Sequence, residues 1–84
     1  MALKIIAATR IGGAGCQHYR LRVTDVAQGY DEIVGVHLDD LDDLIKNLHS
    51  EPSKRRAMFA AMWAMYRVRF SGATPASLVG VDIA

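Results

Sequence analysis

The sequence of 84 residues has little of several features that would define its class at once. Its single cysteine, Cys16, excludes an internal disulfide and therefore a disulfide-stapled scaffold, and it favours a reducing, cytoplasmic setting. The formal net charge of +1 points neither toward a polyanionic partner nor away from one. Because hydrophobic residues make up 51% of the chain and charged residues only 23%, the composition excludes a disordered protein.

Apolar runs long enough to cross a membrane are also missing. The longest, residues 57–66, rises about 15 Å as a helix, whereas a bilayer core is about 30 Å thick. A helix lying on a membrane surface needs a strongly polar face, which the middle of this run lacks. At the start of the sequence, Arg10 interrupts an apolar run too early for a signal peptide. We therefore expect no membrane partner.

Motifs that carry chemistry are absent as well. Residues 10–15 are rich in glycine but match no phosphate-loop pattern, and they precede a predicted strand instead of the helix that such a loop requires. Cys16 and His18 are only local neighbours, without the base and oxyanion donors of a nucleophilic site. The sequence therefore predicts a non-enzymatic protein that needs no cofactor.

Hydrophobic patterning predicts three strands, over residues 3–10, 16–24 and 32–38. In the second strand, Tyr19 and Leu21 alternate with polar side chains. A period of two residues is typical of a strand with one buried and one exposed face. The connections contain glycine and are short. They favour an antiparallel meander.

Two helices are expected after the strands. Leucines recur at helical spacing over residues 39–49, where Asp39 or Asp40 can cap the helix start. Pro52 suits the first turn of a second helix, which we expect to end near Gly72. The tail that follows is predicted as a short helix or a fourth strand. The sequence thus predicts one α+β domain over residues 1–84, of order β-β-β-α-α, with both helices on one face of the sheet.

The second predicted helix is apolar on every side over residues 57–66. A helix on the surface of a small domain needs only one apolar stripe, whereas this one carries three. They are an aromatic stripe of Phe59, Trp63, Tyr66 and Phe70, a methionine stripe of Met58, Met62 and Met65, and a small-residue stripe of Ala57, Ala61, Ala64 and Val68. We expect the aromatic and methionine stripes to pack on the sheet and the first helix. We expect the small-residue stripe to contact either the first helix or a second copy of the chain.

This amount of apolar surface on so short a chain predicts association. The first hypothesis is a protein-interaction module that forms a homodimer, with another protein as the alternative partner. Its size and compactness favour an accessory or regulatory protein of a bacterium or a phage. The interface is predicted to contain Ala57, Met58, Ala61, Met62, Trp63, Ala64 and Met65.

Positive charge on the predicted sheet supports a second hypothesis, nucleic-acid binding. Lys4 and Arg10 share one parity on the first strand, and Arg20 and Arg22 share one on the second. If these residues lie on the face away from the helices, four cations are available to phosphates. A solvated sheet face is the simpler interpretation, because no aromatic side chain lies there to stack on bases.

A third hypothesis is a small zinc-binding protein. Cys16 and His18 share a parity on the second strand, and His37 and Asp39 share one at the end of the third. These ends meet in an antiparallel pair, and all four residues are of types that ligate zinc. A one-residue slip in register would place the groups on opposite faces, and ordinary surface histidines are the simpler interpretation.

Acidic residues are also segregated. Seven lie between Val23 and Ile45 with no lysine or arginine among them: Asp25, Asp31, Glu32, Asp39, Asp40, Asp42 and Asp43. Turn chemistry and helix capping explain most of them. The alternative is an acidic patch that docks on the basic face of a partner or a second subunit.

Overall fold

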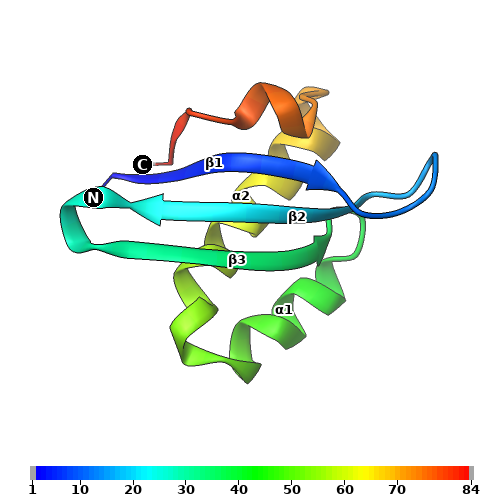
Figure 1. Ribbon diagram of the computed structural model, residues 1–84. Coiled ribbons are helices and arrows are strands. Elements are labelled where there is room, and N and C mark those ends of the chain that lie inside the picture. The colour runs from blue at the N-terminus through cyan, green and yellow to red at the C-terminus, as the bar shows by residue number, and fades with distance from the viewer. Residues whose placement is uncertain (1, 84) are drawn as a thin grey trace.

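The chain forms one antiparallel sheet with two helices on the same face (Figure 1). The computed structural model describes residues 2–83. The sheet has the order β3-β2-β1-β4, formed by β1 (Leu3–Arg10), β2 (His18–Asp25), β3 (Tyr30–His37) and β4 (Asp82–Ile83). The helical elements are η1 (Val26–Gln28), α1 (Leu41–Ser50), η2 (Pro52–Lys54), α2 (Arg55–Ser71) and η3 (Pro75–Leu78), of which those marked η are short 3-10 helices.

The predicted α+β architecture is confirmed, with the meander of β1, β2 and β3 and the two helices behind it. The tail contains both of the expected alternatives, because η3 is followed by the two-residue strand β4. β4 pairs with the start of β1, where Leu3 lies opposite Ile83.

Local signals set the ends of the elements. The Asp40 carboxylate accepts a hydrogen bond of 3.0 Å from the backbone N–H of Asp43, so it caps α1 as expected. Gly72 ends α2 with φ of 68°, a left-handed conformation that glycine adopts without steric cost. η1 ends in the same way at Gly29, which turns the chain from β2 into β3.

A β-bulge changes which side chains of β1 face the helices. Ile5 lies opposite Val23, but Ala7 lies opposite Arg22, so Ile6 is an extra residue in the strand. Beyond the bulge, the residues of β1 that face the helices are therefore the even-numbered ones, whereas before it they are the odd-numbered ones. Arg10 lies opposite Tyr19, whose side chain is buried on the helix side of the sheet.

The core lies between the sheet and the helices, and α2 turns its small side chains into it. The buried residues of α2 are Ala57, Met58, Ala60, Ala61, Ala64 and Met65. They face a sheet that already supplies bulky aliphatic groups, among them Leu21, Val23, Val34 and Val36. Small side chains on the helix let it lie close to such a surface, because interiors pack at nearly crystalline density.

The aromatic stripe therefore faces outward, contrary to the expectation from sequence. Phe59, Tyr66 and Phe70 are 57%, 50% and 73% exposed, respectively. Helical spacing shows which residues share a face, but both faces of this helix are apolar. The spacing alone could not decide which of them would be buried.

A polar cluster fixes the start of α2 on the sheet. Asp25 is fully buried at the end of β2, and its Oδ2 accepts a hydrogen bond of 2.5 Å from Nη2 of Arg56. The Arg56 guanidinium also lies 4.8 Å from the ring centre of Tyr30. The Tyr30 hydroxyl accepts from the N–H of Ala57 and donates to the carbonyl of Ser53. These contacts join β2, β3 and the first turn of α2.

No helix within residues 2–83 combines the length and apolarity that crossing a membrane would need.

Candidate functional site

The outer face of α2 carries three exposed large hydrophobic side chains, whereas no other helix or strand within residues 2–83 carries more than one. We define the outer stripe as Phe59, Met62, Trp63, Tyr66 and Phe70. Steps of three and four residues place these side chains on one side of the helix, opposite the buried alanines. The rings of Tyr66 and Phe70 lie 5.7 Å apart and nearly parallel. Met62 and Trp63 are partly buried against the core, so the stripe is anchored at its centre and open at both ends.

Arginine side chains border the outer stripe. The guanidinium of Arg67 lies 5.3 Å from the ring centre of Trp63, and that of Arg69 lies 5.8 Å from the ring centre of Phe70. Both distances fit cation–π contacts. Arg55 is exposed one turn before Phe59, and α2 contains no acidic residue. The face is thus apolar along its centre and positive along its borders.

The residues predicted from sequence to form an interface are divided by the fold. Ala57, Met58, Ala61, Ala64 and Met65 are buried inside the chain itself, so a partner has no access to them in this fold. Only Met62 and Trp63 reach the surface. Phe59, Tyr66 and Phe70, which the sequence pattern predicts to lie in the core, are exposed instead. Their helical spacing identifies them as one stripe, but it does not indicate that this stripe is exposed.

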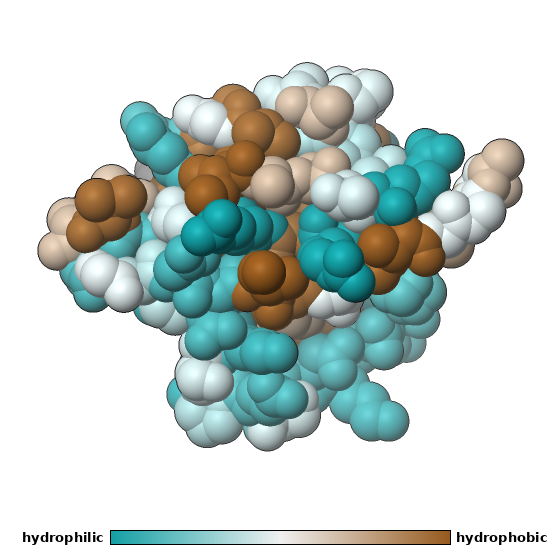
Figure 2. All heavy atoms as spheres, viewed as in Figure 1, coloured by the Kyte–Doolittle hydropathy of each residue, from teal (hydrophilic) through white to brown (hydrophobic). Residues whose placement is uncertain are grey.

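The predicted basic sheet face carries three of the four expected cations, because the bulge moves Arg10 to the other side. Arg10 lies instead beside Tyr19, with Nη2 3.2 Å from the hydroxyl oxygen. Arg22 pairs with Asp31 at 2.6 Å, and Lys4 pairs with Asp82 at 3.5 Å. Figure 2 shows the open face of the sheet, where hydrophilic side chains are interleaved with hydrophobic ones. These observations do not favour a phosphate-binding surface there.

The residues predicted to bind zinc are brought together only in part. His18 lies directly opposite His37, and their rings are stacked with centres 4.1 Å apart. The register on which the zinc hypothesis depended is therefore the observed one. However, within residues 2–83 no three His, Cys, Asp or Glu side chains are grouped so as to hold a metal ion. Cys16 packs against the backbone of Gly12, and Asp39 is exposed in the turn before α1.

The acidic stretch serves mostly the local roles expected of it. Asp40 caps α1, and Asp42 and Asp43 lie in its first turn, where negative charge is favoured by the helix dipole. Asp25 differs, because it is buried in the pair with Arg56. That pair spans 31 residues, and no local pattern in the sequence indicates it.

Comparison of the chain with known protein families, with curated proteins and with solved structures yields no match in any of the three.

Proposed function

We propose that this chain is a non-enzymatic protein-interaction module that forms a homodimer through the outer stripe of α2. The observation that carries the proposal is the exposure of Phe59, Tyr66 and Phe70 on one face of a helix whose other face builds the core. Monomeric proteins seldom leave several large aromatic side chains uncovered side by side.

The exposed area supports an interface between folded chains. With roughly 200 Å² for each aromatic side chain, the exposed fractions of Phe59, Tyr66 and Phe70 leave about 350 Å² uncovered. Met62, Trp63 and the stems of the bordering arginines extend this surface. Together they approach the roughly 500 Å² that each partner contributes to a small specific interface.

The order of residues along the outer stripe suits a second copy. A two-fold axis passing between residues 64 and 65 would place Phe59 of one copy level with Phe70 of the other, and Trp63 level with Tyr66. Each contact would then occur twice, as an isologous interface requires, and each aromatic ring would meet an aromatic ring. The like-charged arginines would stay at the solvated rim, where salt screens their repulsion. We therefore expect the dimer to tighten as salt is added.

The test is the variant Phe59→Glu, compared with Val26→Glu. Phe59→Glu places a carboxylate inside the proposed interface, and it is expected to weaken self-association by about tenfold or more. Val26 is 86% exposed in η1 and does not belong to the outer stripe, so Val26→Glu should leave association unchanged. Sedimentation equilibrium over a concentration series measures both, and circular dichroism checks that the fold is retained. A wild-type mass of 9.2 kDa at every concentration would contradict the proposal.

A further inference from the structure

The outer edge of β3 is a second surface that the proposed function does not use. β3 is the last strand on its side of the sheet, since the order is β3-β2-β1-β4. Its eight residues contain no proline or lysine, and its pairing with β2 has no bulge. Proline, charged side chains and bulges are the usual protections of a sheet edge, and the acidic residues of β3, Asp31 and Glu32, lie in its first half. The edge from Ile33 onward is therefore open to another strand.

The hydrogen-bond pattern identifies the backbone groups that point outward from this edge. The N–H of Leu38 donates to the carbonyl of Gln17 just beyond the paired strands. In an antiparallel pair of strands, every second residue forms backbone hydrogen bonds to the neighbouring strand. Counting back from Leu38 in steps of two, the residues of β3 that bond to β2 include Val36 and Val34. The N–H and carbonyl groups of Ile33 and Gly35 therefore face away from β2. Within residues 2–83 no turn, loop or side-chain hydrogen bond uses them.

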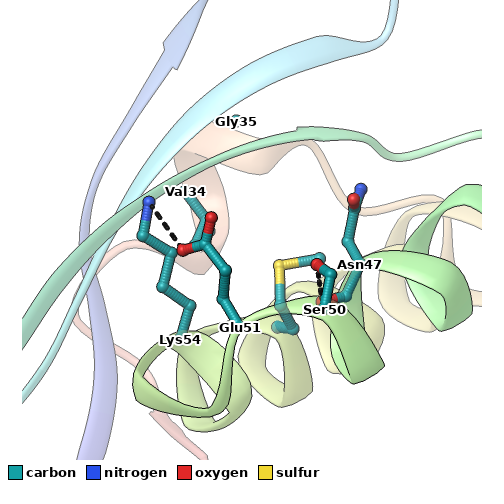
Figure 3. A pocket seen from close by; sticks show the side chains of 7 residues that line it. Val34, Gly35, Asn47, Ser50, Glu51 and Lys54 are labelled. Atoms are coloured by element: carbon teal, nitrogen blue, oxygen red, sulfur yellow. Dashed lines mark hydrogen bonds and ion pairs between the residues drawn. The ribbon is translucent and has the colours of Figure 1, made fainter.

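A hollow of about 140 Å³ lies beside this edge, between β3 and the end of α1. Figure 3 shows Asn47, Ser50, Glu51 and Lys54 rising from the helical side toward the strand that carries Val34 and Gly35. Val34 and Met58 are buried and supply an apolar floor. The hollow is therefore large enough for one side chain of a strand laid along β3.

The charges around the hollow limit what it accepts. Nζ of Lys54 lies 3.5 Å from Oε2 of Glu51, so the two charged groups of the rim already neutralise each other. A charged side chain entering here would lose hydration and find no free counter-charge. A small uncharged side chain such as threonine or valine fits better. It places a methyl group on the floor. The Asn47 amide already donates to Asp43 and the Ser50 hydroxyl to the Asn47 carbonyl, so Asn47 and Ser50 offer their side-chain oxygens as acceptors to an incoming hydroxyl.

A second copy of this chain fits the edge less well than a single extended segment does. In Figure 1, α2 crosses behind the sheet, whereas α1 lies beyond the edge of β3. If two copies joined their β3 edges around a two-fold axis, the overhanging helices of both would compete for the same space. One added strand needs only the strand spacing of about 4.8 Å beside β3, with α1 beneath it.

We propose that the edge of β3 binds an extended, uncharged peptide segment of another protein by strand addition. The backbone of the segment would bond to Ile33 and Gly35, whose outward groups repeat about every 7 Å along the strand. The side chain that points toward the helices would enter the hollow. Its neighbours would lie on the open face beside Ile33.

The test is to select peptides that bind the full chain from a random library. The affinity of the selected peptides is then compared between two matched variants. Gly35→Pro removes the outward N–H without breaking the ladder to β2, and proline is tolerated on strand edges. Gly35→Ala keeps that N–H, and its added Cβ would lie at an ordinary 3.7 Å from Nε2 of His18. Selected peptides are expected to have an uncharged centre and to bind Gly35→Pro about tenfold or more weakly than Gly35→Ala.

A second measurement keeps the test valid if Gly35→Pro fails to fold. In the wild-type chain, a selected peptide should slow amide hydrogen exchange at Ile33 and Gly35 by about tenfold or more. The proposal is overturned if no peptide is enriched, if both variants bind equally, or if the edge amides are not protected. It is also overturned if Gly35→Pro abolishes self-association, since a second copy would then occupy the edge. Phe59→Glu should leave peptide binding intact, which separates this proposal from that of the dimer.

Discussion

Replacing Ala61 with leucine is expected to lower the free energy of unfolding by about 1–3 kcal/mol. Ala61 is fully buried on the face of α2 that lies against the sheet. A larger side chain there must push the helix away from the sheet or adopt a strained rotamer. For a domain of this size, the corresponding fall in Tm is roughly 4–8 °C for each kcal/mol. Thermal unfolding followed by circular dichroism measures it.

The matched control is Phe70→Ala, which removes a far larger side chain from the opposite face of the same helix. Phe70 is 73% exposed, so this change should alter the free energy of unfolding by no more than about 0.5 kcal/mol. Both variants are to be compared at a concentration low enough to keep the chain monomeric. If Phe70→Ala cost more stability than Ala61→Leu, the aromatic stripe would be the core-facing one and the orientation of α2 described above would be wrong.

Stability is expected to fall in acid because of Asp25. The hydrogen bond from Arg56, supported by the positive charge of its guanidinium, holds the pKa of Asp25 below its usual value despite burial. A carboxyl group whose pKa is lower in the folded state stabilises the fold above its unfolded pKa. That contribution is lost as the pH falls through the folded pKa. Tm should therefore be steady near neutral pH and drop below about pH 4.

The variant Asp25→Asn tests this account against Asp31→Asn. Asp25→Asn removes the charge that Arg56 requires, so it should lower Tm at neutral pH and flatten the acid-dependent fall. Asp31 also has a lowered pKa because of its hydrogen bond from Arg22, but that pair is half exposed and screened by solvent. Asp31→Asn should therefore change Tm less and keep most of the acid dependence. Equal effects of the two substitutions would show that the buried pair has no special role.

Much of the fold could be predicted because it depends on local signals. The alternation of Tyr19, Leu21 and Val23 and the glycines between the strands define an antiparallel meander. Asp40 and Gly72 occupy the cap positions that their residue types favour. Each of these features is decided within a few residues of chain, where the physical preferences of single side chains are strongest.

The features that could not be predicted depend on tertiary packing. The bulge at Ile6 places the side chain of Arg10 on the helix side of the sheet. No turn signal or proline in the sequence indicates this bulge. The orientation of α2 depends on how much volume the sheet already fills, which only the assembled sheet defines. The pairing of Asp25 with Arg56 joins segments 31 residues apart. In each case the deciding partner is distant in sequence.

In the candidate site, too, features that follow from local sequence could be predicted, and features that depend on tertiary packing could not. The approach of His18 to His37 follows from the strand register and was predictable from alternation. Of the outer stripe, Met62 and Trp63 are predicted from sequence as interface residues. The alignment of Phe59, Tyr66 and Phe70 is also visible in the sequence, but the expectation that these three rings lie in the core is wrong. The open edge of β3 could not be recognised before the order of the strands was known.

The measurement that tests the central claim most directly is the quenching of tryptophan fluorescence by acrylamide across a concentration series. Trp63 is the only tryptophan of the chain, and it lies at the centre of the outer stripe, so its accessibility reports on that face alone. Quenching is expected to fall as the protein concentration is raised through the dissociation constant of the dimer, and Phe59→Glu should keep it high. Quenching that stays constant over the whole range in the wild-type protein would contradict the covering of this face by a second copy.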